Sequence, residues 1–398
     1  MNKEVQDSLS RLQSYCMQED FKGYDPYDGL TSSFFQSIPF ISSNRVSRLA
    51  WIQFFKRSTI NFRSLLGIRK DYNPKGLGLF LSGYCNLYQK EPLQEYIDKI
   101  IYLSKKIGQL QSKGFSGACW GYNFDWQARA FFLPKNTPTV VASAFIANAL
   151  LDAYEITNDE GLLKTARTTC DFILKDLNRT YDNNGDFSFS YSPLDKSVVF
   201  NASLLGSRLL SRVYTFTKEN DLLKEAKKSF AFCCKRQKPD GSWAYGTLPF
   251  HQWVDNFHTA YNLECIADYI RFSGDKEYET QLAKGFNYYI NTFFTEEGMS
   301  KYYNNSTYPI DIHAPAQLVI TLTKLGKFTE HKELIDKVLN WTIKNMQSDE
   351  GFFYYQINKH FSSKIPYMRW AQSWMFYALS SYLKFDSYEE NLYLQYPC

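Results

Sequence analysis

Two segments of the chain repeat one another at a constant offset of 60 residues: ASAFIANALLDAYEITNDEGLLKTA (142–166) and ASLLGSRLLSRVYTFTKENDLLKEA (202–226). Nine residues of the first segment are identical to the residue 60 positions further on: Ala142, Ser143, Leu150, Tyr154, Thr157, Leu162, Leu163, Lys164 and Ala166. In the second segment, apolar residues from Leu222 through Ala226 to Cys233 recur in steps of three and four, which is the spacing of one helical face. Each segment therefore predicts two helices joined by a short polar turn.

The same unit recurs along the chain with weaker identity. First helices of the pairs are expected to begin near Gly76, Thr139, Ser197, Phe257, Ile312 and Met368, and second helices near Pro92, Glu160, Asp221, Lys276 and Thr329. Loops rich in glycine and aromatic residues separate the pairs: CWGYNF (119–124), NNGDFSFSY (183–191), PDGSWAYG (239–246), EEGMSKYYN (296–304) and DEGFFYYQ (349–356). Four loop glycines, Gly185, Gly241, Gly298 and Gly351, follow one another at steps of 56, 57 and 53 residues. This regular spacing predicts stacked helical hairpins.

Six first helices with five obvious second helices point to a ring that is completed by the N-terminal region. The segment RVSRLAWIQFFKRSTINFRSLLG (45–67) has helical periodicity and is expected to supply the sixth outer helix. We therefore predict an all-α (α/α)6 toroid, in which residues 1–70 close the ring and residues 71–398 form the hairpins of a single domain. An open solenoid is the alternative, and it would need terminal capping repeats.

Charge and cysteine usage exclude several classes of protein. The chain has 45 basic and 41 acidic residues, well mixed, and no run of like charge predicts a nucleic-acid or polybasic membrane surface. The eight cysteines are scattered without a CxxC pair, which favours reduced, structural thiols. The N-terminus has no apolar signal region, and we find no apolar run of 18 residues. A cytoplasmic protein without a membrane span is expected.

The loops that enter the inner helices of such a ring open at one mouth, so residues far apart in sequence are expected to converge there. Aromatic faces stack on the apolar face of a sugar, while amides and charged groups bond to its hydroxyls. The expected substrate-binding residues are Trp120, Tyr122, Trp126, Arg129, Trp253, Asn256, Tyr261, Tyr308, Gln317, Arg369, Trp370 and Gln372. The candidate acid–base residues, which can move protons, are Asp125, Asp255, Asp311, His258 and His313.

Several of these residues also have a structural interpretation. Asp255 stands where a carboxylate caps the N–H groups of a helix start, a role that does not exclude a function. Trp243, in a glycine turn, is expected to be structural. Arg129 and Arg369 suit a carboxylate or phosphate, but salt bridges to Asp125 or Asp311 are an equal alternative.

Metal and cofactor sites are not expected. The sequence DIH (311–313), with His258 or a cysteine, could offer metal ligands, but no close His or Cys pair accompanies it. The chain has no glycine-rich phosphate loop and no GxSxG elbow. QKPDGSW (237–243) matches the structural QxxDGxW repeat of class II terpene cyclases, but their DxDD acid motif is absent.

Four segments carry a resemblance to a known family: WGYNFDWQARAFFLPKNTPTVVASAFIANALLDAYE (120–155), DGSWAYG (240–246), WVDNFHTAYNLECI (253–266) and RWAQSWMFYAL (369–379). They resemble bacterial exopolysaccharide-biosynthesis proteins of the VpsJ-like kind, over about residues 70–385. The resemblance implies an (α/α)6 barrel, an association with polysaccharide and other polysaccharide-biosynthesis proteins as partners. It implies no catalytic residue.

The leading hypothesis is a carbohydrate-active protein of bacterial polysaccharide metabolism that binds a glycan, with an anionic one as a candidate, at the toroid mouth. Hydrolysis, elimination and epimerisation stay open as reactions. Hydrolysis would need two carboxylates about 5–10 Å apart. Elimination or epimerisation would need a base, a Tyr or His acid and an arginine that neutralises a carboxylate. A non-catalytic glycan-binding protein and an isoprenoid-handling toroid are the alternatives.

Overall fold

The computed structural model describes residues 1–395, and within them six helices form a closed inner ring. These helices are α5 (Pro74–Lys90), α7 (Val140–Thr157), α9 (Phe200–Thr217), α11 (Asn256–Ser273), α13 (His313–Lys324) and α15 (Ser373–Gln395). Each packs on the next along the chain, and α15 packs back on α5, which closes the ring. The predicted (α/α)6 toroid is confirmed, and the inner helices begin within about five residues of their expected starts.

The outer ring consists of one second helix per hairpin and the first helix of the chain. The second helices are α6 (Gln94–Gln109), α8 (Glu160–Asp176), α10 (Asn220–Cys234), α12 (Glu279–Phe293) and α14 (Lys332–Met346). Helix α1 (Asn2–Gln18) packs on α15. Its Ser8 donates a hydrogen bond to Gln347 Oε1 at 2.7 Å, just beyond α14. The chain therefore closes the ring through its own N-terminus.

The helix that closes the ring is not the predicted one. Helix α4 (Arg45–Arg57), from the segment 45–67, packs instead on η1 (Asp28–Thr31) and β1 (Trp126–Gln127) above the mouth. Only Ile52 and Phe55 of α4 are buried. Helix α1 presents the longer apolar stripe that an outer helix needs, consisting of Val5, Leu9, Leu12 and Cys16.

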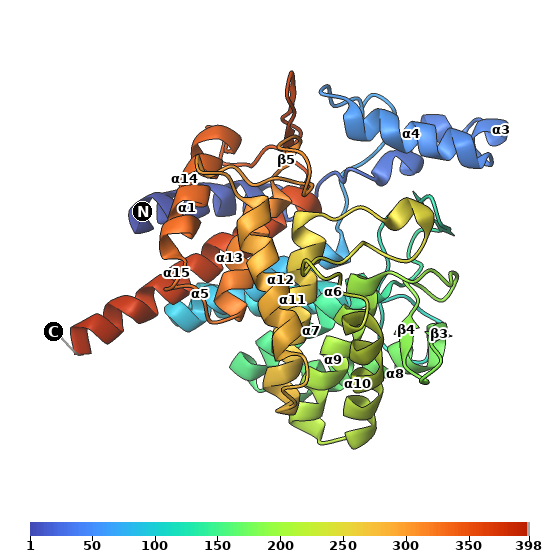
Figure 1. The fold of residues 1–398 in the computed structure, drawn as a ribbon. Helices are drawn as coiled ribbons and strands as arrows, with labels where there is room; N and C mark the ends of the chain where they lie inside the picture. Colours follow the sequence, from blue (N-terminus) through green and yellow to red (C-terminus); the bar gives the residue numbers. More distant parts are fainter. Residues whose placement is uncertain (396–398) are drawn as a thin grey trace.

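Residues 33–66 form an extension that stands out from the ring, which we call the arm (Figure 1). It comprises the short helices α2 (Ser33–Gln36) and α3 (Pro39–Ser42), helix α4 and the loop that follows. The arm therefore belongs to neither ring of the toroid.

The glycine and aromatic loops form tight turns and short strands between the hairpins. The strands are β1, β2 (Phe132–Leu133), β3 (Arg179–Tyr181), β4 (Phe187–Phe189), β5 (Ile310–Asp311), β6 (Gln356–Ile357) and β7 (Ser362–Ser363); β1 pairs with β2, β3 with β4, and β6 lies between β5 and β7. Gly241 has φ +93°, and a Cβ there would lie 2.4 Å from the carbonyl oxygen of Lys284. Trp243 is buried and donates Nε1–H to the carbonyl of Cys233 at 3.1 Å, so its predicted structural role is confirmed.

Helix α7 is largely apolar, although Ser143, Asn148, Asp152 and Glu155 interrupt its sequence, so it contains no unbroken apolar run of 18 residues. Among the described helices, it alone is long and apolar enough to cross a bilayer, but 72% of it is buried inside the protein. Its apolarity follows from its place in the inner ring, where neighbouring helices cover most of its surface. The seven described cysteines are also buried and unpaired, as expected, and Cys398 lies outside the described residues.

Candidate functional site

A cavity of about 650 Å³ opens at the N-terminal ends of the inner helices. Its volume falls within the range of about 300–1,000 Å³ that is common for small-molecule sites. Helix α4 forms one side of it, and the loops between hairpins form the rest. The wall is largely aromatic, with Tyr27, Tyr122, Trp126, Tyr191, Tyr245, Trp253, Phe257, Tyr261, Tyr302, Tyr303 and Trp370.

His258 projects into this cavity from the first turn of α11 and is held by Asp255. One oxygen of the buried Asp255 carboxylate caps the helix, because it accepts the backbone N–H of His258 at 2.8 Å. The other oxygen lies 2.7 Å from His258 Nδ1. With Nδ1–H donating to the carboxylate, Nε2 is the free nitrogen of the ring and can accept a proton. Asp255 therefore caps the helix, as predicted, and it also orients the imidazole of His258, while its acid–base role stays a prediction.

His313 lies beside His258 but in a different environment. It is stacked between Phe257 and Trp374, with ring centroids 4.3 and 4.2 Å away. Its Nε2 is 2.8 Å from the hydroxyl of Tyr261. Burial, and then the nearby charge of Lys75, hold the pKa of His313 well below its ordinary value. His313 is therefore a neutral imidazole at neutral pH, paired with a tyrosine hydroxyl.

Lys75 lies at the floor of the cavity, at the start of α5. Its Nζ is 4.3 Å from the ring centroid of Phe145 and 5.3 Å from that of Trp374. No salt bridge to Lys75 occurs among the described residues. Burial, and then repulsion from Arg369, hold the pKa of Lys75 well below its ordinary value. The side chain is thus a desolvated amine that faces the cavity among aromatic rings.

Arg369, by contrast, already has a carboxylate partner. Its Nε and NH2 donate to the two oxygens of the buried Asp25, at 2.5 and 2.8 Å. The guanidinium lies 5.0 Å from the ring centroid of Tyr122. The expected salt bridge to Asp125 or Asp311 is replaced by this one, from a loop that sequence reasoning had not considered.

Asp311 is buried directly behind the cavity wall. Its carboxylate accepts hydrogen bonds from Trp370 Nε1 at 2.9 Å, Gln356 Nε2 at 2.5 Å and the backbone N–H of His313 at 3.0 Å. Burial raises its pKa from an ordinary value of 3.8 to about 6. Asp311 supports Trp370 and the start of α13, and it does not line the cavity.

The structure brings together about half of the residues expected at the mouth. Those that line the cavity are Tyr122, Trp126, Arg129, Trp253, His258, Tyr261, His313, Arg369 and Trp370. Five others pack or bond inside the ring or its loops: Trp120 donates to the carbonyl of Ile107, Asn256 accepts from Tyr289, Gln317 bonds to Glu264, Gln372 bonds to the backbone of Phe353, and Asp125 accepts the N–H of Lys135. Tyr308 is partly exposed and outside the cavity.

The sequence analysis did not predict five residues that line the cavity. Lys75, Lys56, Tyr27 and the pair Tyr302 and Tyr303 all line the cavity. Lys75 follows an Asn-Pro helix start, where a lysine is ordinarily exposed, so the sequence carried no signal for it. The tyrosine pair does lie in a predicted loop, EEGMSKYYN, and its place in the repeat was an available signal.

No carboxylate lines the cavity among the described residues, although several cations do. Lys56, Arg57, Lys75 and Arg129 reach the wall without a carboxylate within ion-pair distance in residues 1–387. A second basin of about 430 Å³ adjoins the cavity and shares Lys56, Arg57, Arg129, Tyr302 and Tyr303 with it. The combined space is basic and aromatic.

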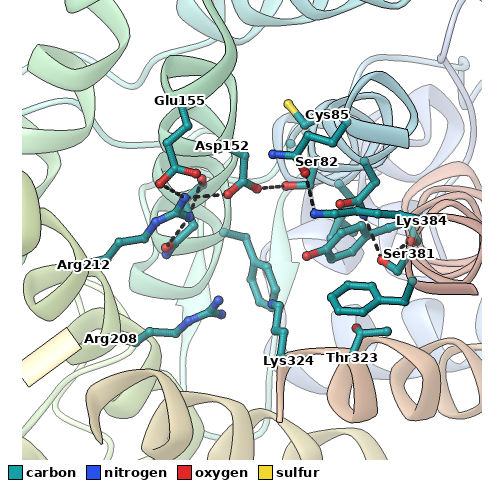
Figure 2. Close-up of a pocket in the computed structure, with 18 of the residues that line it drawn as sticks. Ser82, Cys85, Asp152, Glu155, Arg208, Arg212, Thr323, Lys324, Ser381 and Lys384 are labelled. Carbon is teal, nitrogen blue, oxygen red and sulfur yellow. Dashed lines mark hydrogen bonds and ion pairs between the residues drawn. The ribbon is translucent and has the colours of Figure 1, made fainter. Parts of the chain in front are cut away.

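A smaller pocket of about 320 Å³ lies at the opposite end of the ring, near the C-terminal ends of the inner helices (Figure 2). Arg212 lies 2.7 Å from Asp152, which also accepts a hydrogen bond from Ser82 (Figure 2). Arg208 contacts Asp268 at 2.5 Å, and Lys324 contacts Glu264 at 2.9 Å. Phe145 lines this pocket, and its ring lies 4.3 Å from the Nζ of Lys75, which lines the cavity, so Phe145 lies between the two spaces.

Comparisons with solved structures place the chain among six-hairpin toroids. It is similar to cellobiose 2-epimerase from Bacillus thermoamylovorans, with a TM-score of 0.67 and 11% identity over 97% of this chain and 100% of the other. An unsaturated glucuronyl hydrolase specific for heparin matches with a TM-score of 0.62 and 12% identity, over 97% of each chain. The GH76 α-mannanase from Bacteroides thetaiotaomicron matches with 0.64 and 12%, over 80% and 88%.

These likenesses are of fold. No family model matches the chain, and no curated protein matches its sequence. The predicted toroid class is thereby shown, whereas the resemblance to the VpsJ-like family stays a prediction.

Proposed function

We propose that this chain is a carbohydrate-active enzyme that moves a proton at a carbon atom of an anionic sugar, by epimerisation or elimination. The observation that carries the proposal is the Nε2 of His258, oriented by Asp255 and aimed into a cavity with no carboxylate on its described wall. Hydrolysis through a pair of carboxylates is disfavoured, because Asp255 and Asp311 lie behind the wall.

In this proposal each polar group of the wall has a separate task. His258 removes a proton from a carbon next to a carbonyl or carboxylate group, and Asp255 stabilises the imidazolium that forms. Tyr261, which is hydrogen-bonded to the neutral His313, is the candidate for delivering a proton, to carbon in epimerisation or to the leaving oxygen in elimination. Lys75 and Arg129 neutralise the acid group of the sugar, and the aromatic rings stack on its apolar face.

Two lines of similarity support a carbohydrate substrate. Structural neighbours include a cellobiose 2-epimerase and an unsaturated glucuronyl hydrolase that is specific for heparin. The sequence resemblance to VpsJ-like proteins supports a place in bacterial polysaccharide synthesis, on the cytoplasmic side, beside other proteins of that synthesis. The adjoining basin supports an oligosaccharide rather than a single sugar.

The test is solvent exchange at carbon. Uronic acid-containing and neutral oligosaccharides are incubated with the protein in D2O, and ¹H NMR follows the loss of carbon-bound protons. We expect exchange in an acidic oligosaccharide, with a new epimer or a new C=C bond, and a loss of at least about 100-fold in His258→Asn. The exposed His360→Asn is the matched control, since His360 lies outside the cavity.

Two results would contradict the proposal. New reducing ends with neither deuterium at carbon nor a new C=C bond would show hydrolysis instead. Binding of an oligosaccharide without any chemical change would show a glycan-binding protein, which is the alternative class.

A further inference from the structure

The arm carries an unusual share of the exposed apolar surface of the molecule. Among the described residues, sixteen large hydrophobic side chains are exposed, and seven of them lie in the arm: Phe34, Phe40, Ile41, Val46, Phe54, Ile60 and Leu65. Phe40 is 91% exposed and Leu65 is 81% exposed. A patch of large apolar side chains that is exposed to solvent indicates a surface that binds another protein or a membrane.

The arm is held in place by internal contacts, so this exposure is not that of a frayed segment. Trp51 stacks on Phe34 and Phe54, with ring centroids 6.2 and 5.8 Å away, and Phe54 stacks on Phe62 at 5.8 Å. Trp51 Nε1 also donates to the carbonyl of Gly29 at 3.0 Å. This aromatic stack joins α2, α4 and the following loop into one element.

The arm also lies in the most one-sided charge environment of the chain. Residues 29–70 contain seven Lys or Arg and no Asp or Glu, although the whole chain has 45 basic and 41 acidic residues. Arg63 is buried against Asp28, and Lys70 pairs with Glu19. The exposed Arg45 and Arg57 have no carboxylate within ion-pair distance among the described residues. The even mixing of charge in the sequence as a whole conceals this local excess.

We infer that the arm docks on the surface of an anionic phospholipid bilayer. Basic residues interspersed with exposed Phe, Ile and Leu, next to a tryptophan, match the composition of elements that lie in the headgroup region. The apolar side chains enter the boundary of the acyl chains, while Arg45 and Arg57 remain among the lipid phosphates.

The same charges argue against the two other occupants of this surface. In a symmetric dimer the same patch meets itself, and an arm without carboxylates would then place arginine against arginine. A nucleic acid would satisfy the arginines, but it would leave Phe40 and Leu65 in water. An anionic bilayer satisfies both features.

Docking would also bring the cavity to the membrane. Val46, Leu49, Ala50 and Gln53 of α4 line the cavity, so the arm and the cavity share one helix. The site would thereby meet glycans that are still attached to lipid. This consequence rests on the proposed function, whereas the docking itself does not.

The experiment is flotation of the full chain with lipid vesicles, without any sugar. We expect binding to mixed phosphatidylcholine–phosphatidylglycerol vesicles, weaker binding to phosphatidylcholine alone, and release by salt. Arg45→Gln with Arg57→Gln lowers the partition coefficient about fivefold for each charge removed. Phe40→Ser with Leu65→Ser lowers it about tenfold or more.

Matched controls lie on the outer helices and their turns. Leu93→Ser with Ile101→Ser removes two exposed apolar side chains outside the arm, and Lys105→Gln with Lys164→Gln removes two exposed charges. These variants should bind like the unaltered protein, and all variants should show unchanged circular dichroism melting curves.

Three outcomes would overturn the inference. One is equal partition of the arm variants and the controls, or no binding of the unaltered protein to the mixed vesicles. Another is a dimer in sedimentation that Phe40→Ser with Leu65→Ser dissociates while vesicles are ignored. The third is tighter retention on duplex DNA than on the vesicles. Each is independent of sugar chemistry, so failure here is separate from failure of the proposed function.

Discussion

The two ends of the toroid differ in how their charged side chains are paired. At the end that holds the smaller pocket, buried cations meet buried carboxylates: Arg208 contacts Asp268, and Lys324 contacts Glu264. At the mouth, Lys75 faces the cavity without a carboxylate, and Asp255 and Asp311 lie behind the wall rather than on it.

This difference separates a structural from a functional use of ionisable groups. Paired charges hold neighbouring inner helices together, and they leave little affinity for a ligand. An unpaired, desolvated amine destabilises the fold, and it persists where a ligand supplies the missing partner. The paired charges of the smaller pocket are therefore expected to govern stability, and the mouth is expected to govern binding.

The largest expected effect tests the paired charges of the smaller pocket. Arg208→Met leaves Asp268 and Glu264 short of a buried partner, and it should lower the free energy of unfolding by about 3–5 kcal/mol in urea titrations. Arg271→Met is the matched control, because the largely exposed Arg271 bonds to the same Asp268. It should cost about 0–1 kcal/mol. Equal costs for the two variants would contradict the contrast between the ends.

Asp311→Asn tests the carboxylate behind the mouth. Burial raises the pKa of Asp311 to about 6. The protonated carboxyl therefore contributes its full stabilisation of the fold below pH 3.8, and this stabilisation is lost as pH rises through about 6. The stability of Asp311→Asn relative to the unaltered protein should therefore rise by about 3 kcal/mol between about pH 4 and 7. Gln356 can rotate its amide to accept from the new side chain. A flat difference across that range in urea titrations would contradict the raised pKa.

Lys75→Met tests the unpaired amine at the floor. The substitution removes a desolvated charge and keeps the side-chain volume, so it should stabilise the fold by about 1–3 kcal/mol at neutral pH. Because the pKa of Lys75 is depressed, the stability of the unaltered protein should rise with pH between the folded pKa and 10.5, and the variant should lack this rise. Thermal unfolding measures both, and a destabilised variant would show that Lys75 is structural.

The smallest expected change in stability comes with Asp255→Asn. Asparagine caps a helix about as well as aspartate, so the free energy of unfolding should change by less than about 1 kcal/mol. The imidazole of His258 loses its carboxylate partner, and the proton exchange proposed above should fall by about 100-fold or more. Unchanged exchange in this variant would reduce Asp255 to a helix cap.

Sequence reasoning was most successful where the signal is local and repeated. Helical periodicity and the turn glycines identified the hairpins, because Gly241 and Gly351 occupy φ values of +93° and +97° that other residues rarely adopt. His258 and Asp255 were also identified, since they lie three residues apart on one helix start.

The sequence-based predictions were wrong where the choice lay between two helical segments, or between two faces of one helix, and no local pattern favoured either. The segment 45–67 and helix α1 both show helical periodicity, but only α1 has a continuous apolar stripe and the position to close the ring. Gln317 and Gln372 lie near inner-helix starts like His313, but they turn into the packing between helices.

The sequence by itself determined the helical hairpins, because periodicity and turn chemistry repeat in every unit, whereas the choice of α1 as the helix that closes the ring came from the tertiary structure. Only the tertiary structure decided what faces the mouth, since that depends on the rotation of each inner helix about its own axis. It also decided that the carboxylates stand behind the wall, that Lys75 is unpaired, and that the apolar side chains of the arm are left in water. Those relations join residues up to several hundred positions apart, and no local pattern records them.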